Sequence, residues 1–517
     1  MIQRSYDKII SFQIFLVFAI VVIALLAAIA TDGARRGQTS VFPDLYRNFS
    51  SLAVAISELD YGTTGLVGLR DVDDTLKQGG MIPNAPVGPL LKMVHEPAKF
   101  DALLLKAAHL QHVDRARTMI VEANETGSVE YYKLAMILFG HHVTGFYWLW
   151  FGIVSFVSLC FLVTFRHRPV LIFPAIIYLV ALFAFVHHLD PNDLQKGTPT
   201  NARLFPFTSL YLVLFSLVLS AAAPARRWLG VISIAVCGLL YAMFVNARSV
   251  ALWQFGAPVG VLIMAIMVHV FSGLQRVWGG IILARYALWP LVVFSLATGA
   301  GIATHHLREN RAAYSHMSFM GHEFWPMIVY SEMKYYRSDI PKIEKETGMT
   351  IGKNPDAFVG AMARLEIMKR HERFSDYLID GGYWNIQKWN SLCRQIVFDH
   401  WREHPMRMLK DYVDAFRVLR SQFLTYFFTW GMALLIIPAA LLGWLASRGK
   451  VESLAILIPA LVVFFPLGGV ATMLVPVIGE GYDPDYILPP LFLLLIIAGL
   501  PWCRKLMALN EPVGLSS

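Results

Sequence analysis

Residues 9–30 read IISFQIFLVFAIVVIALLAAIA, a stretch that contains no charged side chain. A helix of about 20 apolar residues spans the hydrocarbon core of a bilayer. Further apolar runs follow along the chain, which is 56% hydrophobic and 15% charged over its 517 residues. Soluble domains carry about 25% charged residues. The sequence therefore predicts an all-α polytopic membrane protein.

We expect about ten transmembrane helices, because each apolar run of sufficient length is a candidate span. The predicted spans are residues 9–30, 143–165, 170–187, 204–222, 228–246, 253–273, 278–302, 423–446, 452–475 and 487–503. Arg4 and Lys8 precede the first run, so a signal peptide is the alternative for it. The run is longer than a typical signal core and more spans follow, which favours a retained anchor.

The short loops orient the chain. Basic residues lie on the same side as the N-terminus, and they are Arg166, Arg168, Arg226, Arg227, Arg276, Arg448, Lys450, Arg504 and Lys505. The positive-inside rule then predicts that both termini are cytoplasmic. The expected divisions are a first span (1–30), a first outer loop (31–142), a six-helix block (143–302), a second outer segment (303–422), a three-helix block (423–503) and a cytoplasmic tail (504–517).

The charge and the cysteine content argue against a nucleic-acid-binding protein and against a fold held by disulfides. The net charge of +8 comes largely from residues at helix ends, so we reject nucleic acid as a partner. Of the four cysteines, only Cys393 is expected in an outer loop, which leaves no intrachain disulfide framework. A bacterial inner membrane, with the large loops facing the periplasm, fits this pattern.

Both outer segments have helical patterns. Apolar residues recur at helical spacing through residues 98–122, and residues 129–142 are expected to run straight into the second span. Residues 394–421 predict a helix at the membrane interface, with a bend or break at Pro405. We therefore expect mostly helical outer segments lying on the membrane surface.

Ionisable residues at the membrane edge are functional candidates, because their burial is costly. Asp32 ends the first span, although a helix terminus facing water is an alternative reading. The pairs His187–His188 and His305–His306 are poorly spaced for chelation, because adjacent residues on a helix point in different directions. We therefore expect no metal site at these pairs.

Residues 304–337 are the richest stretch. They interleave aromatic residues with the candidate binding residues Arg308, Arg311, His316, His322, Glu323 and Lys334. Cations at a membrane edge suit the phosphate of a lipid carrier. An ordinary interfacial helix with an aromatic belt is the alternative.

Three local features resemble the GT-C superfamily of membrane glycosyltransferases, which includes protein mannosyltransferases and aminoarabinose transferases. Asp32 follows the first span and opens a long outer loop; the loop closes with the aromatic-Gly sequence of Phe139 and Gly140; and a His-rich segment, 315–325, follows a middle span. Many family members carry a paired acidic motif in the first loop. Here Asp32 stands alone, and the pair Asp73–Asp74 lies further along.

The resemblance implies transfer of a sugar from a polyprenyl-phosphate donor to an extracytoplasmic glycan, lipid or protein. Asp32, or else Asp44, would take the proton of the acceptor hydroxyl. Arg308, Arg311 and Lys334 would stabilise the leaving phosphate, with His316 and His322 as hydrogen-bonding groups. A divalent metal ion is a possible assistant, but no convincing ligand set is visible.

Two other classes stay open. A transporter or flippase of lipid-linked substrates is disfavoured by the absence of internal repeats. A non-catalytic membrane subunit of a polysaccharide assembly or export system is favoured by the missing acidic pair, which leaves open whether the chain is an enzyme.

Overall fold

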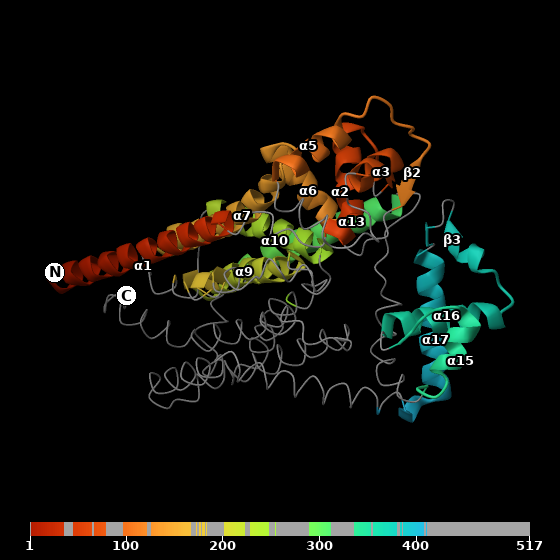
Figure 1. Cartoon of the computed structure of the whole chain (residues 1–517). Helices are drawn as coiled ribbons and strands as arrows, with labels where there is room; N and C mark the ends of the chain where they lie inside the picture. Colours follow the sequence, from red (N-terminus) through yellow and green to blue (C-terminus); the bar gives the residue numbers. More distant parts are fainter. Residues whose placement is uncertain are drawn as a thin grey trace.

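The computed structural model describes a mainly helical chain. The residues described are 2–35, 45–64, 67–78, 97–120, 126–166, 172, 175–176, 178–180, 182–183, 201–222, 228–247, 254, 289–311, 336–352, 355–379, 383–384, 386–407 and 410. Figure 1 shows the arrangement of the helices.

Three described helices are long and apolar enough to cross a membrane. They are the stretch Phe12–Thr31 of α1 (Ile2–Arg35), α7 (Val143–Phe165) and α10 (Trp228–Ala247). A shorter apolar stretch, Pro290–His305, belongs to α13 (Trp289–Arg311). These helices confirm the coarse expectation of a helical chain with membrane-type spans.

Of the remaining predicted spans, residues 204–222 lie within the helix α9 (Asn201–Ala222), and the others are described only in part or not at all. Residues 170–187 are described at isolated positions, and of residues 253–273 only Gln254 is described. The spans 423–446, 452–475 and 487–503 lie outside the described residues. One boundary differs from the prediction: α13 continues to Arg311 rather than ending at residue 302. His305, Arg308 and Arg311 therefore belong to the helix itself.

Small residues let α10 and α13 approach closely. Gly238 and Ala242 lie one turn apart on α10, and Ala297 and Gly301 lie one turn apart on α13. A Cβ atom on Gly238 would meet the Cβ atom of Ala297 at 2.8 Å, and one on Gly301 would meet that of Ala242 at 2.6 Å. Helices in lipid associate through such small surfaces, because no hydrophobic effect drives them together.

The helix α9 (Asn201–Ala222) is joined to α7 by polar side chains in an otherwise apolar core. The indole Nε1 of Trp150 donates to the hydroxyl of Thr208 over 2.6 Å, and the hydroxyl groups of Ser158 and Tyr211 lie 3.0 Å apart. Buried polar groups need such partners because no water is available to them. These bonds fix α7 against α9.

The segment predicted as the first outer loop, residues 31–142, has described residues that form a subdomain of helices and one small sheet. Its elements are α2 (Leu45–Asp60), β1 (Val67–Leu69), α3 (Arg70–Gln78), α5 (Pro97–Ala108), β2 (Thr118–Ile120) and α6 (Thr126–Phe139). Strands β1 and β2 pair antiparallel, with Val67 opposite Ile120. In Figure 1, α2, α3, α5 and α6 gather beyond one end of α7 and α10.

The expected helix over residues 98–122 is wrong in its second half. The helix α5 ends at Ala108, and residues 118–120 form strand β2. The turn between them is held by Asp114, whose carboxylate accepts from the amide of Ala116 at 3.0 Å. Such a local bond from an aspartate side chain competes with helix formation, which the apolar spacing alone does not reveal.

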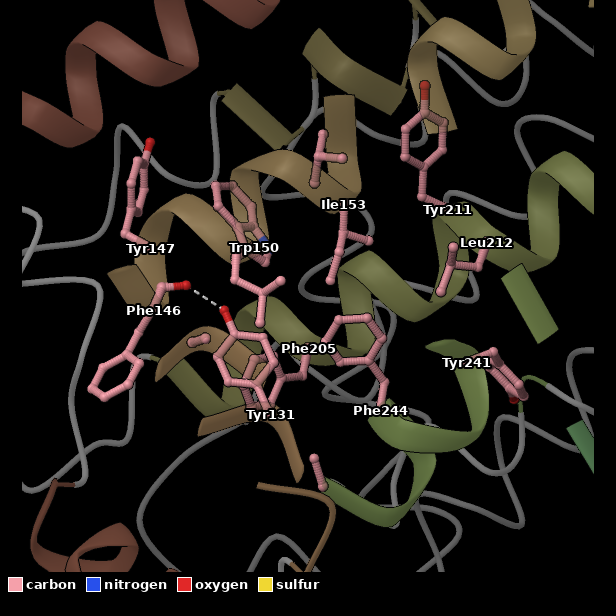
Figure 2. Close-up of a cluster of buried hydrophobic side chains, with 14 of the residues drawn as sticks. Tyr131, Phe146, Tyr147, Trp150, Ile153, Phe205, Tyr211, Leu212, Tyr241 and Phe244 are labelled. Carbon is pink, nitrogen blue, oxygen red and sulfur yellow. Dashed lines mark hydrogen bonds between the residues drawn. The ribbon is translucent and has the colours of Figure 1, made fainter. Parts of the chain in front are cut away.

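The helix α6 packs across the ends of α2 and α10. A Cβ atom on Gly127 would lie 2.3 Å from the backbone nitrogen of Ala247, so only glycine permits this approach. Figure 2 shows the ring of Tyr131 beside Phe205 and Phe244, with its hydroxyl donating to the carbonyl oxygen of Phe146. Burial raises the pKa of Tyr131 well above its usual value, so this phenol stays a donor.

The helix α6 does not run straight into α7, as expected from the sequence. Gly140, at φ +75°, ends α6, and residues 140–142 form a turn before α7 begins at Val143. Glycine adopts this left-handed backbone at little cost. The turn separates α6 from the membrane-type helix α7 and contains two histidines, His141 and His142.

The segment predicted as the second outer segment, residues 303–422, contains α15 (Ile340–Thr347), α16 (Pro355–Lys369), η5 (Phe374–Tyr377), the pair β3 (Leu378–Ile379) and β4 (Tyr383–Trp384), and α17 (Ile386–Glu403). Ile343, Ile351 and Phe358 form one small apolar cluster, and Ile367 and Leu392 belong to another. The helix α17 begins earlier than the expected residue 394 and ends just before Pro405. The predicted break at Pro405 is therefore confirmed.

Candidate functional site

The predicted site residues are described only in part. Asp32 lies in the last turn of α1, and Arg308 and Arg311 lie at the end of α13. Five of the predicted residues lie outside the described part of the chain: Asp44, His316, His322, Glu323 and Lys334. The described residues therefore give helix positions for the first three and bring together none of the eight side chains.

Asp32 is at the level of the turn between α6 and α7. The hydroxyl of Tyr147, in the second turn of α7, donates to the carbonyl oxygen of Ile29 at 2.9 Å. Asp32 lies three residues beyond Ile29 on α1, about 4.5 Å further along the helix axis. Figure 1 shows this end of α1 beside α7. His141 and His142 therefore lie at the same end of the helices as Asp32, which is predicted to lie at the membrane edge.

His141 forms the first of two histidine–aspartate pairs at this edge. Its Nε2 lies 2.8 Å from a carboxylate oxygen of Asp60, the last residue of α2. The side chains of His141 and Asp60 are 15% and 20% exposed, so the pair is reachable from solvent yet largely enclosed. An ionised carboxylate can only accept, so Nε2 carries a proton and Nδ1 is the nitrogen that can take another.

His142 forms the second pair, with Asp101 of α5. Its Nδ1 lies 2.9 Å from one carboxylate oxygen of Asp101, and the other oxygen accepts from the amide of Val143 at 2.8 Å. The amides at the start of a helix lack intrahelical partners, so Asp101 satisfies one of them for α7. The His142 ring is 55% exposed. This second pair has a structural role as the cap of α7.

A third imidazole faces the first pair. The rings of His109 and His141 lie 6.5 Å apart between centroids, at an interplanar angle of 66°. Nδ1 of His109 lies 3.0 Å from the carbonyl oxygen of Leu105, which can only accept, so Nε2 is the free nitrogen. His109 and His141 thus lie near each other, and within the described part of the chain each keeps one ring nitrogen without a hydrogen-bond partner.

Tyr61 holds the two chain segments of this arrangement together. Its hydroxyl donates to the carbonyl oxygen of Ala107 and accepts from the amide of Leu110, each at 2.8 Å. Burial raises the pKa of Tyr61, with a smaller contribution from the neighbouring Asp60 carboxylate. The phenol is therefore neutral at physiological pH. It fixes the end of α2, which carries Asp60, against the end of α5, which precedes His109.

An exposed apolar surface adjoins the histidines. Ile137, Leu138 and Phe139, the last three residues of α6, are 62%, 58% and 41% exposed. We call these three residues the apolar edge. Exposed contiguous apolar residues mark a contact with lipid or another apolar partner. The apolar edge immediately precedes, along the chain, the turn that carries His141.

Four other acidic residues of the segment 31–142, Glu58, Asp71, Asp73 and Asp74, are paired or buried within the fold. Glu58 lies 2.6 Å from the ammonium group of Lys133, and Arg117 binds both Asp71 and Asp74. Asp73 is fully buried. The adjacent acids Asp73 and Asp74 therefore do not form an exposed acidic pair of the kind expected from the GT-C resemblance.

No metal centre is apparent in the described residues, where no group of three or more His, Cys, Asp or Glu side chains is placed to hold an ion. Comparison with protein families, curated proteins and solved structures gives no match for this chain.

Neither Asp60 nor His141 is among the site residues predicted from the sequence. The available signal was the position of His141 and His142 directly after Phe139-Gly140 and before an apolar run. Their aspartate partners lie 81 and 41 residues away along the chain, so spacing could not identify the pairs.

Proposed function

We propose that this chain is a multi-pass membrane transferase of the GT-C kind. It would move a sugar from a polyprenyl-phosphate donor to a glycan, lipid or protein outside the cytoplasm. The first outer segment would face the periplasm of a cell with the chain in its inner membrane. In this proposal Arg308 and Arg311 keep their predicted role at the leaving phosphate, and Asp32 is one candidate for the group that takes the acceptor proton.

One observation supports the proposal: ionisable side chains and exposed apolar residues lie close together along the chain, at the end of α6 and before the apolar helix α7. The Asp60–His141 pair adjoins the apolar edge, which begins at Ile137. A lipid-linked sugar has the same division, with a polar head and an apolar tail. Sugar transfer from such a substrate needs a base near the membrane surface, because the hydroxyl that receives the sugar must lose its proton.

The two alternative functions require different structural features. A non-catalytic subunit needs the outer subdomain only as a docking surface and tolerates loss of its carboxylates. A transporter of lipid-linked substrates needs a path between its helices rather than an exposed acid–base group. The largely enclosed but solvent-reachable Asp60–His141 pair favours a transferase over both.

The test is the glycan profile of cells whose only copy of the protein is changed. We expect that deletion removes one sugar from a surface or lipid-linked glycan and that its polyprenyl-linked donor accumulates, both measured by mass spectrometry. Asp32→Asn at normal membrane abundance reproduces the deletion if Asp32 takes the acceptor proton, and it retains the sugar if another group does. An unchanged profile after deletion would refute the transferase.

A further inference from the structure

We infer that the Asp60–His141 pair is the proton acceptor of the transfer reaction, with His141 as the catalytic base and Asp60 as the residue that positions it. This inference rests on the proposed function. It names a base other than Asp32, the acid expected from the sequence.

The hydrogen bond to Asp60 fixes the reactive nitrogen of His141. Asp60 lies 2.8 Å from Nε2, so the ring is held in the tautomer whose Nδ1 has a lone pair. Among the described residues, none is hydrogen-bonded to this Nδ1. A base held by a third group in this way is the common arrangement for activating a hydroxyl.

The surroundings of the pair fit a hydroxyl substrate on a lipid carrier. His141 and Asp60 are largely enclosed, at 15% and 20% exposure, which strengthens their electrostatic interaction relative to bulk water. His109 faces the His141 ring across 6.5 Å and offers a second polar contact. The apolar edge, which starts at Ile137, gives the lipid tail a neighbouring surface to follow.

The inferred sugar transfer requires no electron donor or acceptor, and its atoms are accounted for as follows. The acceptor oxygen forms a bond to the anomeric carbon as the bond from that carbon to the phosphate oxygen breaks. The electron pair of the broken bond leaves with the polyprenyl phosphate. The hydroxyl proton moves to Nδ1 of His141, and the resulting imidazolium is stabilised by the Asp60 carboxylate.

The second pair supplies a matched control. His142 lies beside His141 in the same turn and also binds an aspartate, but Asp101 is committed to the start of α7 through Val143. We expect His142→Gln to retain the glycan, provided that the protein reaches normal membrane abundance. This comparison separates a base at His141 from a general need for histidine in the turn.

The experiment follows the sugar that is lost on deletion, in cells carrying His141→Gln, Asp60→Asn or His142→Gln as the only copy. Removing a general base lowers a rate by roughly 100-fold to 10,000-fold, so we expect His141→Gln to abolish the sugar nearly completely. Asp60→Asn keeps the positions of both residues and alters only the charge, and we expect an intermediate loss. Unfolding midpoints of the purified variants in detergent verify that each one is folded.

Chemical rescue separates a base from a structural residue. We expect added imidazole to restore part of the transfer in spheroplasts that carry His141→Ala, because it can replace the missing base. Imidazole should not improve His142→Ala. A structural role for His141 would give no rescue.

Two failures are distinguishable. If deletion removes a sugar but His141→Gln and Asp60→Asn both retain it, the inferred base is wrong and the transferase stands. If deletion leaves every glycan and lipid-linked sugar unchanged, the proposed function itself is wrong.

Discussion

At the residue scale, the ion pair between Glu58 and Lys133 joins α2 to α6. The Glu58 side chain is only 3% exposed, and its carboxylate lies 2.6 Å from the ammonium group. Removing one partner of a buried pair leaves a charge in a poorly solvated place, at a cost of about 3 kcal/mol. We therefore expect Lys133→Met to lower the unfolding midpoint of the protein in detergent.

Two further variants control that measurement. Lys342 forms an exposed pair with Glu346 at 3.9 Å, and such surface pairs contribute about 0.5 kcal/mol. Lys342→Met should therefore leave the midpoint nearly unchanged. Adding Glu58→Gln to Lys133→Met should recover most of the loss, because no buried charge remains. Equal midpoints for Lys133→Met and Lys342→Met would contradict the buried pair.

Glu344 makes a loop near α15 sensitive to acid. Its carboxylate accepts from the amides of Ile351 and Gly352, at 2.7 and 3.1 Å, and these bonds lower its pKa. A lowered native pKa stabilises the loop at every pH above the unfolded value of about 4.3, and the effect is lost as pH falls through the native value.

We expect acid to open this loop, measured as faster cleavage near Ile351 by an acid-active protease below about pH 4, where glutamate becomes protonated. The variant Glu344→Gln should lose protection at pH 7 and show little further change on acidification. Identical cleavage of the two proteins at pH 7 would exclude a role for this carboxylate.

At the element scale, the contact between α10 and α13 depends on the size of one residue. A Cβ atom on Gly301 would lie 2.6 Å from the Cβ atom of Ala242, whereas one on Gly299 would meet nothing within 4 Å. Overpacking of this kind costs about 1–3 kcal/mol. We expect Gly301→Leu to lower the unfolding midpoint, and Gly299→Leu, two residues away on the same helix, to be tolerated.

The two leucine variants share a helix and a change in volume, so their difference isolates the contact. Membrane abundance and unfolding midpoint are measured together, because a failed contact lowers both. If Gly299→Leu were the more harmful variant, α13 would present a different face to α10.

At the scale of the whole molecule, the proposed topology puts the two ends of α7 on opposite sides of the membrane. The exposed Thr64 belongs to the outer subdomain, and Arg166 follows the far end of α7. In a background with all four cysteines replaced, we expect a membrane-impermeant maleimide on intact cells to label Thr64→Cys. Arg166→Cys should react only after permeabilisation, and the reverse pattern would invert the chain.

Local patterns in the sequence were enough to predict a helical chain with membrane-type spans. The span predicted at residues 143–165 coincides with α7, and that predicted at 228–246 ends one residue before α10 does. Pro405 marks the end of α17. These predictions succeed because apolar length and proline geometry act locally, so each is legible in a short window.

The partner of each carboxylate, by contrast, depends on the tertiary structure. Asp60, Asp74 and Glu58 look alike in the sequence, yet they meet a histidine, an arginine and a lysine respectively. Each partner is more than 40 residues away along the chain. Ion pairs depend on distance in space, which is set by how α2, α3, α5 and α6 pack, and no local pattern records that packing.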